Sequence, residues 1–183
     1  MDTVNATQQE EHIKPLEGPE AIGKIKELTQ KADTGFLVTN IKTGLPVSAR
    51  PMSTQLVDEQ GNIWFLSVRD SNHNKEIAAD SLVHLFYQAS AHAGFLNIYG
   101  IAEIGDDKAK IDELWDPIAK VWFQGGKDDP LVTYIKVSPL TGYYWDNKHG
   151  SVIALAKMAA SLVTGKTMDD SIEGTLDVGE YLI

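Results

Sequence analysis

The sequence predicts a mainly β fold with peripheral helices, in which an antiparallel sheet forms a barrel or a sandwich. Short β-rich segments follow one another along the 183-residue chain, and turn-forming residues separate most of them. Hydrophobic residues make up 43% of the chain and charged residues 23%, which is enough apolar material for one packed core. Because hairpins rather than helical crossovers join most of the segments, we expect an antiparallel sheet of about seven strands.

The first half of the chain predicts a helix followed by a three-stranded meander. Ile22, Ile25 and Leu28 recur at helical spacing after Pro19, so a helix is expected over 19–31. The three strands are expected at 35–41, 46–56 and 63–68. After them, Ser71 or Asn72 is suited to cap a short helix that runs to about residue 80.

The second half predicts more strands and a helical insert. Strands are expected at 82–88 and 95–104, and in the longer one Leu96, Ile98, Ala102 and Ile104 share a face. A helical region follows at 106–124. There Asp116 is suited to be an N-cap and Pro117 the first residue of a second short helix.

The last predicted elements are a hairpin and a helix. The hairpin pairs 131–137 with 143–146 around a turn at 139–142, and an apolar helix follows at 151–163. The predicted domain spans 19–165. Residues 1–18 are expected to be a flexible lead-in and 166–183 an acidic tail.

Charge and composition narrow the possible functions. The net charge of −10 and the pI of about 4.8 disfavour binding to nucleic acid or to an anionic membrane surface. The chain has no cysteine, which excludes disulfides and thiolate metal sites, and its five histidines show no metal-ligand spacing. The polar N-terminus is unlike a targeting sequence, and the longest apolar stretch, 152–163, is too short to cross a bilayer. We therefore expect a cytoplasmic protein.

One candidate site lies in the strand that contains Arg50, Pro51 and Met52. Alternation places Arg50 and Met52 on the same face, and Pro51 requires an edge strand or a bulge. An arginine beside a thioether suits an anionic ligand with a flat ring. A solvent-exposed arginine is the alternative, and this segment alone favours it.

A second candidate lies where the strand ending near Ser67 leads into the helix that begins after Ser71. Free N–H groups at a helix start favour an anion, and a phosphate there would explain Lys75 in the first helical turn. An ordinary strand–helix connection with solvated charges accounts for this segment equally well.

The aromatic residues are harder to assign. Trp115 and Trp122 have helical spacing and are expected in the core. Trp145 stands where the last strand leaves the sheet, a position that suits core packing, dimer packing or contact with a ligand ring.

Taken in order, these segments resemble the pyridoxamine 5′-phosphate oxidase-like superfamily, and within it the general stress protein branch. The resemblance covers about 19–146. It rests on the segments 35–39, 50–52, 63–67, 71–77 and 142–145.

The resemblance implies a split β-barrel that forms a homodimer and binds FMN in two symmetric clefts at the interface. Arg50 and Lys75 would hold the phosphate together with Ser67 and Ser71. Met52 would lie by the isoalloxazine, and Trp145 would approach it from the second subunit. The implied cofactor-binding residues are thus Arg50, Pro51, Met52, Ser67, Ser71, Lys75 and Trp145.

The expected function is that of an FMN-binding protein, as a flavin-dependent oxidoreductase of unknown substrate. The chain lacks the basic, histidine-containing C-terminal motif of true pyridoxamine phosphate oxidases, so synthesis of pyridoxal phosphate is not expected. One alternative is a flavin-binding stress protein that stores or senses FMN without turnover. Others are the same barrel binding haem or deazaflavin, with His73 or His149 as a possible iron ligand, and a barrel that binds no flavin.

Overall fold

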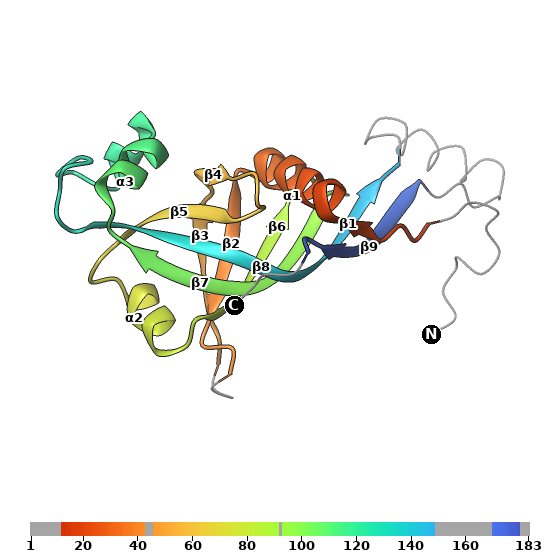
Figure 1. Ribbon diagram of the computed structural model, residues 1–183, viewed down its shortest axis with the longest axis horizontal. Helices are drawn as coiled ribbons and strands as arrows, with labels where there is room; N and C mark the ends of the chain where they lie inside the picture. Colours follow the sequence, from red (N-terminus) through yellow and green to blue (C-terminus); the bar gives the residue numbers. More distant parts are fainter. Residues whose placement is uncertain (1–11, 43–45, 92, 149–169, 180–183) are drawn as a thin grey trace.

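The computed structural model describes residues 12–42, 46–91, 93–148 and 170–179. In this part of the chain nine strands form one sheet (Figure 1). The strands are Leu16–Glu17 (β1), Thr34–Thr39 (β2), Ser48–Ser53 (β3), Leu56–Val57 (β4), Ile63–Val68 (β5), Leu82–Gln88 (β6), Phe95–Gly105 (β7), Val132–Asn147 (β8) and Ser171–Asp177 (β9). A mainly β fold with peripheral helices is therefore confirmed.

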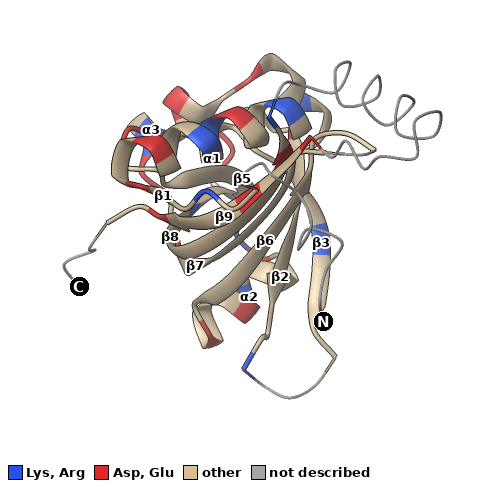
Figure 2. Cartoon of the chain, turned by 90° about the vertical axis from the view of Figure 1, so that its right-hand side faces the viewer, with Lys and Arg blue, Asp and Glu red and all other residues tan. Residues whose placement is uncertain are grey.

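The helices lie around this sheet. They are Gly18–Ala32 (α1), Asn72–Ala79 (α2), Lys108–Leu114 (α3) and the 3-10 helix Pro117–Val121 (η2). Figure 1 shows α1 on one side of the sheet, α2 on the opposite side and α3 at one end. In Figure 2 charged residues of both signs are prominent on the helices, whereas most of the sheet carries none. None of the described helices is long and apolar enough to cross a membrane.

The strand order leaves the sheet open. Its main path is β1-β9-β8-β7-β6-β2-β3, while β5 pairs with β8 and β4 pairs with β5. All of these pairs are antiparallel except β1 with β9. Since no ladder joins β3 to β5 within the described residues, the sheet does not close into a continuous barrel there. The candidate site lies in this gap.

Local sequence signals set several element boundaries. Pro19 lies at the start of α1, and Ile25 and Leu28 of that helix are fully buried. Ser71 caps α2 by accepting a hydrogen bond from Asn74 N, and the Asp116 carboxylate caps η2 by accepting one from Ile118 N. These caps agree with the predicted ones, because capping depends only on residues within one turn.

The predicted hairpin over 131–146 is wrong, because β8 is one continuous strand. Its first part pairs with β5 and its last part with β9, while β7 runs along its other edge. Pro139 lies in the part of β8 between the segment that pairs with β5 and the segment that pairs with β9. It is close to a register shift in the ladder with β7, at Tyr99/Gly100. The outer edge of β8 has no partner strand between Val137 and Gly142, and the ladder with β7 is irregular there, so the proline does not end the strand.

Other boundaries also differ from the prediction. The strand expected at 46–56 is divided into β3 and β4, and Ile104 at the end of β7 is 37% exposed. Residues 171–177, expected in an acidic tail, form β9 between β8 and β1. The apolar helix expected at 151–163 lies outside the described residues.

Two apolar clusters hold these elements together. The larger one packs α1 against the inner face of the sheet, and its fully buried members include Ile25, Leu37, Phe65, Ile98 and Ile135. The smaller one fixes the helical insert to the outer face of β5, and its buried members are Trp64, Leu66, Ile111, Leu114, Ala119 and Val132. The insert is therefore a packed part of the domain.

Gly35→Ala should destabilise the protein, because a Cβ at Gly35 would overlap the ring of Tyr87. That ring is 3% exposed and its hydroxyl lies 2.9 Å from Thr54 Oγ1, so it has no room to move aside. We expect a loss of about 1–3 kcal/mol in the free energy of unfolding, measured by urea denaturation.

Gly23→Ala is the matched control. Gly23 lies in α1, and a Cβ added there would have no atom within 4 Å, so alanine should leave stability unchanged or raise it by up to about 1 kcal/mol. Equal unfolding midpoints for the two variants would contradict the role assigned to Gly35.

Candidate functional site

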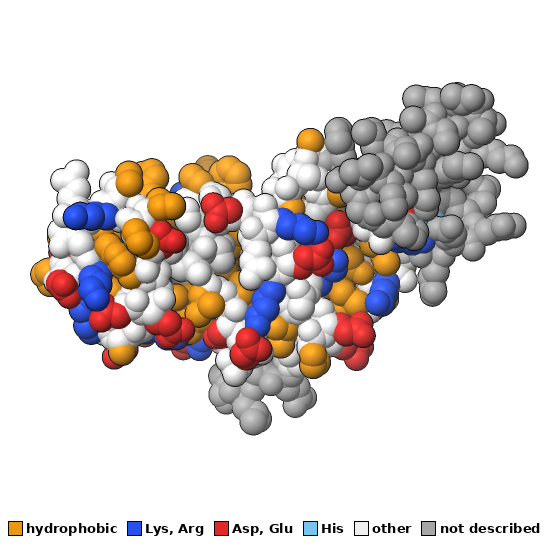
Figure 3. All heavy atoms as spheres, turned by 90° about the horizontal axis from the view of Figure 1, so that it is seen from above, with side chains coloured by type: hydrophobic (Ala, Val, Ile, Leu, Met, Phe, Trp, Pro, Cys, Tyr) orange, Lys and Arg blue, Asp and Glu red, His pale blue; other side chains and the backbone are white. Residues whose placement is uncertain are grey.

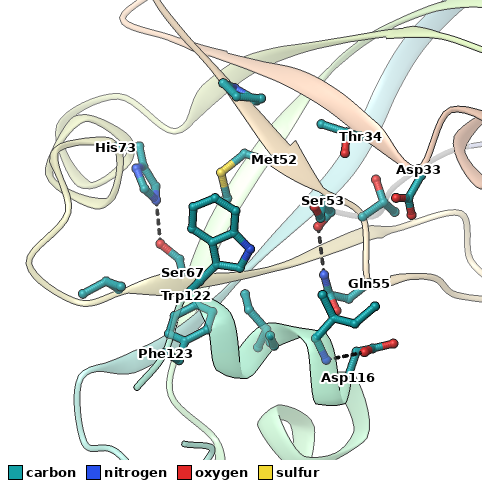
Figure 4. Close-up of a pocket in the computed structure, with 16 residues that line it drawn as sticks. Asp33, Thr34, Met52, Ser53, Gln55, Ser67, His73, Asp116, Trp122 and Phe123 are labelled. Atoms are coloured by element: carbon teal, nitrogen blue, oxygen red, sulfur yellow. Dashed lines mark hydrogen bonds between the residues drawn. The ribbon is translucent and has the colours of Figure 1, made fainter. Parts of the chain in front are cut away.

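The candidate site is a cavity of about 450 Å³ in the gap between β3 and β5, within the usual range for small-molecule sites. Residues 51–55 form one wall and residues 66–68 at the end of β5 form another. His73 of α2 and residues around η2 complete the lining, with Asp33 and Thr34 at the rim. Figure 4 shows His73 and Ser67 at one side of this cavity and Asp33, Gln55 and Asp116 at the other.

The structure brings some of the predicted site residues together. Pro51, Met52 and Ser67 line the cavity. Ser71 does not line it, but its Oγ is 3.5 Å from Ser67 Oγ. Arg50 precedes the lining residues on β3, which is the terminal strand of the sheet path and thus tolerates Pro51.

Two of the predicted site residues, Lys75 and Trp145, do not line the cavity. Lys75 is exposed on α2 and does not line the cavity, and no described residue forms an ion pair with it. Trp145 lies in a separate hollow on the sheet, which shares only Thr34 with the cavity. Contact of either residue with a ligand stays a prediction.

Arg50 is held by an ion pair that spans three elements. Its Nη2 donates to Glu76 Oε2 at 2.7 Å, linking β3 to α2. The same carboxylate oxygen accepts a hydrogen bond from Thr39 Oγ1 of β2. Arg50 Nη1 is buried without a hydrogen-bond partner, although a buried donor left unpaired costs about 1–3 kcal/mol. The guanidinium is thus positioned by Glu76 and still has a free donor.

The ion pair also determines the charge of Glu76. Burial raises the pKa of this carboxyl, but hydrogen bonds from Thr39 and Arg50 and the positive charge of Arg50 outweigh it and hold the pKa below its usual value. Glu76 is therefore ionised at neutral pH.

Behind the cavity wall, a buried polar network fixes Ser67. Ser67 Oγ donates to Asn74 Oδ1 at 2.8 Å, and Asn74 Nδ2 donates to Thr133 Oγ1 at 3.0 Å. His73 Nε2 is 2.7 Å from the same serine oxygen. Since the serine hydrogen is directed to Asn74, the Nε2–H of His73 must donate to Ser67. The pair therefore lacks the geometry of a serine nucleophile activated by a histidine base.

His73 is the main site residue that the sequence did not place in the cavity; there it entered only as a possible iron ligand. Burial lowers its pKa, the positive charge of Arg50 lowers it further, and Glu76 opposes this in part. The ring is thus neutral at pH 7. The only sequence signal was its position in the first turn of the helix that Ser71 caps.

Trp122 is the second such residue, and the expectation that it lies in the core is wrong. The indole is 77% exposed and lines the cavity. Helical spacing misled here because residues 117–121 form one short 3-10 helix, which buries only Ala119. Trp115, in contrast, is half-buried and packs against Phe123 with 5.9 Å between ring centroids.

The hollow that contains Trp145 has a volume of about 550 Å³ and an aromatic lining. Phe36 is 54% exposed, Phe86 41% and Trp145 43%. Asn97 also lines this hollow, and its Oδ1 is buried without a hydrogen-bond partner. The exposed aromatic rings show that this face of the sheet is incompletely covered in the single chain.

The described residues contain no group of three His, Asp or Glu side chains able to hold a metal ion. The lining of the cavity offers Ser67 and His73 at one side and carboxylates at the other, with apolar side chains between them, and Arg50 lies next to the lining residue Pro51 on β3.

His73→Gln should reduce the dependence of stability on pH. The folded protein holds the pKa of His73 below its ordinary value of 6.5, so below about pH 6.5 the unfolded chain takes up a proton that the folded chain resists. The free energy of unfolding should therefore fall as the pH drops below that value, and less steeply in the variant.

Urea denaturation between pH 7.5 and 5.0 measures this slope. His84, whose pKa burial also lowers, contributes in the same direction, and His84→Gln is the matched control for a histidine outside the cavity. A slope unchanged from wild type in His73→Gln would show that His73 is not shielded as described.

Comparison with known proteins places this geometry in a family. The family model described as pyridoxamine 5′-phosphate oxidase like matches residues 20–169. A putative general stress protein 26 from Jannaschia sp. CCS1 is similar in structure, with a TM-score of 0.71 and 25% identity over 85% of this chain and 96% of that one. A general stress FMN/FAD binding protein from Xanthomonas citri gives a TM-score of 0.54 and 27% identity over 63% of this chain and 82% of that one.

A curated relative gives a shorter match. Protein bli-3 of Neurospora crassa is 25% identical over 134 residues, or 68% of this chain, and the match spans only 64% of bli-3. The family match, in contrast, covers most of the chain and includes all the elements that form the cavity. The chain belongs to the pyridoxamine 5′-phosphate oxidase-like family.

Proposed function

We propose that the chain binds FMN in the cavity between β3 and β5 and acts as a flavin-dependent oxidoreductase. The observation that carries the proposal is the buried, unpartnered Nη1 of Arg50, on the strand that carries the lining residues Pro51 and Met52. A phosphate that reached this donor would relieve its desolvation and gain a charge-assisted hydrogen bond. The flavin-binding relative from Xanthomonas citri supports the choice of ligand.

The phosphate group would lie at the end of the cavity near Ser67 and His73. Ser71 supplies a hydroxyl beside Ser67, and Arg50 supplies its unpaired Nη1–H donor, while the hydrogens of Ser67 and His73 are already used within the polar network. Lys75 is one helical turn after Ser71, and it keeps its charge unpaired among the described residues. In a chain with a net charge of −10, the positive charges of Arg50 and Lys75 would offset the general repulsion of a phosphate.

The isoalloxazine would lie along the apolar part of the lining. Pro51 and Met52 come from β3, and Leu66 comes from β5. When bound, FMN supplies the capacity to accept and pass on electrons. The chain's own residues hold the phosphate end, exclude water along the ring and orient it against the walls.

We further propose that the chain forms a homodimer through the aromatic face of its sheet. The exposed rings of Phe36, Phe86 and Trp145 are apolar surface that a second copy would cover. Trp145 would approach the flavin of the partner subunit.

The alternatives differ in what they require of the site. Storage or sensing of FMN needs the same contacts but no turnover. Electron transfer from a reduced nicotinamide to an acceptor would therefore favour the oxidoreductase over storage or sensing. Haem ligation by His73 would use Nδ1 or break the 2.7 Å contact of Nε2 with Ser67. His149, the other possible iron ligand, lies outside the described residues.

The absorption spectrum of the purified protein, before and after addition of FMN and desalting, tests the cofactor. We expect flavin bands near ~450 nm to remain with the protein after desalting, as for a cofactor held by its protein. A colourless protein would contradict FMN binding, and a Soret band in its place would favour the haem alternative.

Arg50→Ala should weaken FMN binding by about 1.5–3 kcal/mol, or about 10- to 100-fold, because it removes a charge-assisted hydrogen bond to the phosphate. The measurement is a fluorescence titration of FMN. Because riboflavin lacks the phosphate, Arg50→Ala should weaken the binding of riboflavin much less than that of FMN.

Glu76→Gln is the matched control, since it breaks the same ion pair but keeps the guanidinium. Its affinity for FMN should equal or exceed that of wild type. If both variants lost FMN equally, Arg50 would act only by positioning α2.

Light scattering at micromolar concentration should give twice the monomer mass of 20.1 kDa. Trp145→Asp should shift the mass towards the monomer, because the burial of a carboxylate in an aromatic interface is costly. Leu140→Asp, at a 37% exposed position outside the hollow, is the control and should remain dimeric. A wild-type monomer would contradict the shared cleft.

A further inference from the structure

The exposed indole of Trp122 is not explained by FMN binding or by the core. Trp122, which directly follows η2, is 77% exposed, and Ile118 of η2 is 71% exposed; both line the cavity. In Figure 4 Trp122 projects across the cavity, with Met52 on the facing wall. Figure 3 shows apolar side chains exposed at the end of the molecule where α3 lies. Large apolar side chains gathered in this way are typical of a binding surface.

The backbone that carries Trp122 is fixed on both sides. Asp116 caps η2, Ala119 is buried, and Trp122 N donates to Ala119 O at 2.9 Å. The next residue, Phe123, packs against Trp115. The indole is thus presented at the cavity by an anchored segment, as a preorganised surface for a flat ring.

The charges around the cavity are separated. His73, on which the positive charge of Arg50 acts, lies at one side of the cavity, whereas Asp33 and Asp116 lie at the other (Figure 4). Of the described residues that line the cavity, none is lysine or arginine. The Asp33 carboxylate has no hydrogen-bond or ion-pair partner within the described residues, so its negative charge is not neutralised. An anion at this end would be repelled.

Resting on the proposed flavin site, we infer that the cavity takes a second, planar aromatic ligand that is uncharged or cationic, with Trp122 as the residue that stacks against it. The carboxylates of Asp33 and Asp116 determine the charge specificity by repelling anionic aromatics. The second substrate class is therefore flat, apolar and unphosphorylated. Phosphate recognition is confined to the end of the cavity near Arg50.

The experiment compares two probes that differ by one sulfonate, 1,4-naphthoquinone and 1,4-naphthoquinone-2-sulfonate. Their binding to protein loaded with FMN is measured by equilibrium dialysis at low salt, and retained flavin is quantified separately for every variant. The chain has no cysteine, so quinone–thiol adducts do not interfere. We expect wild type to bind the neutral quinone at least about fivefold more tightly, a difference that shrinks as added salt screens the carboxylates.

Substitutions separate stacking from charge. Trp122→Ala should weaken binding of the neutral quinone about 3- to 10-fold, and Trp122→Phe should retain most of it. Val121→Ala is the matched control, because Val121 is 71% exposed but does not line the cavity. The double variant Asp33→Asn, Asp116→Asn should bring the two quinones closer in affinity, because asparagine can still cap η2. Glu59→Gln removes an exposed charge outside the cavity and should leave the difference in affinity between the two quinones unchanged.

Failure of this inference can be distinguished from failure of the proposed flavin site. If FMN is retained but both quinones bind equally or not at all, the inference is overturned and the flavin site stands. If Trp122→Ala behaves like Val121→Ala, the assigned stacking role is wrong. If Trp122→Ala instead changes the oligomeric mass, the indole serves a protein interface. If no flavin is retained, the proposed function fails and the inference falls with it.

Discussion

The geometry of the site depends on the length of β8. Because this strand runs unbroken from Val132 to Asn147, it pairs with β5 in its first part and with β9 in its last, while β7 lies along its other edge. The β2–β3 hairpin is attached to the same sheet through β6. β3 and β5 are therefore held at the ends of two branches of one sheet, close to each other but unpaired. A hydrogen bond from Gln55 N to Trp64 O ties the branches together at one end of the gap.

Within this gap, electrostatics divides the site into two parts. Glu76 neutralises Arg50 in part, yet it also fixes the guanidinium and leaves one buried nitrogen unpaired. His73 is kept neutral by burial and by Arg50, and it holds the Ser67 hydroxyl in place without adding charge. Asp33 and Asp116 lie across the cavity from this group. The proposed phosphate position thus lies on the side of the cavity away from these two carboxylates.

The sequence predicted best what short-range chemistry determines. The bounds of β5 and the caps formed by Ser71 and Asp116 follow from residues within a few positions of each other. The continuity of β8 through Pro139 depends on which strands lie beside it, and β9 exists because β8 offers it an edge. Neither fact is contained in a local pattern, so a hairpin and a tail were expected there.

The same distinction holds for the site. The resemblance implied cofactor contacts for Met52 and Ser67, and both residues line the cavity. His73 and Trp122 were not placed there, because their roles depend on the packing of α2 and η2 around a gap between distant strands. Spacing indicates that residues share a face, but it does not indicate whether that face is covered.

The parallel pairing of β1 with β9 bears on the order in which the protein can fold. His12 Nδ1 lies 2.9 Å from Ser171 O, a contact between residues 159 positions apart. A Cβ at Gly174 would overlap the carbonyl oxygen of Lys14, so only glycine allows the two segments to approach this closely. On the ribosome, the first strand must wait for nearly the whole chain to emerge before it gains its partner. The entropy of closing so large a loop makes this edge a late event in folding.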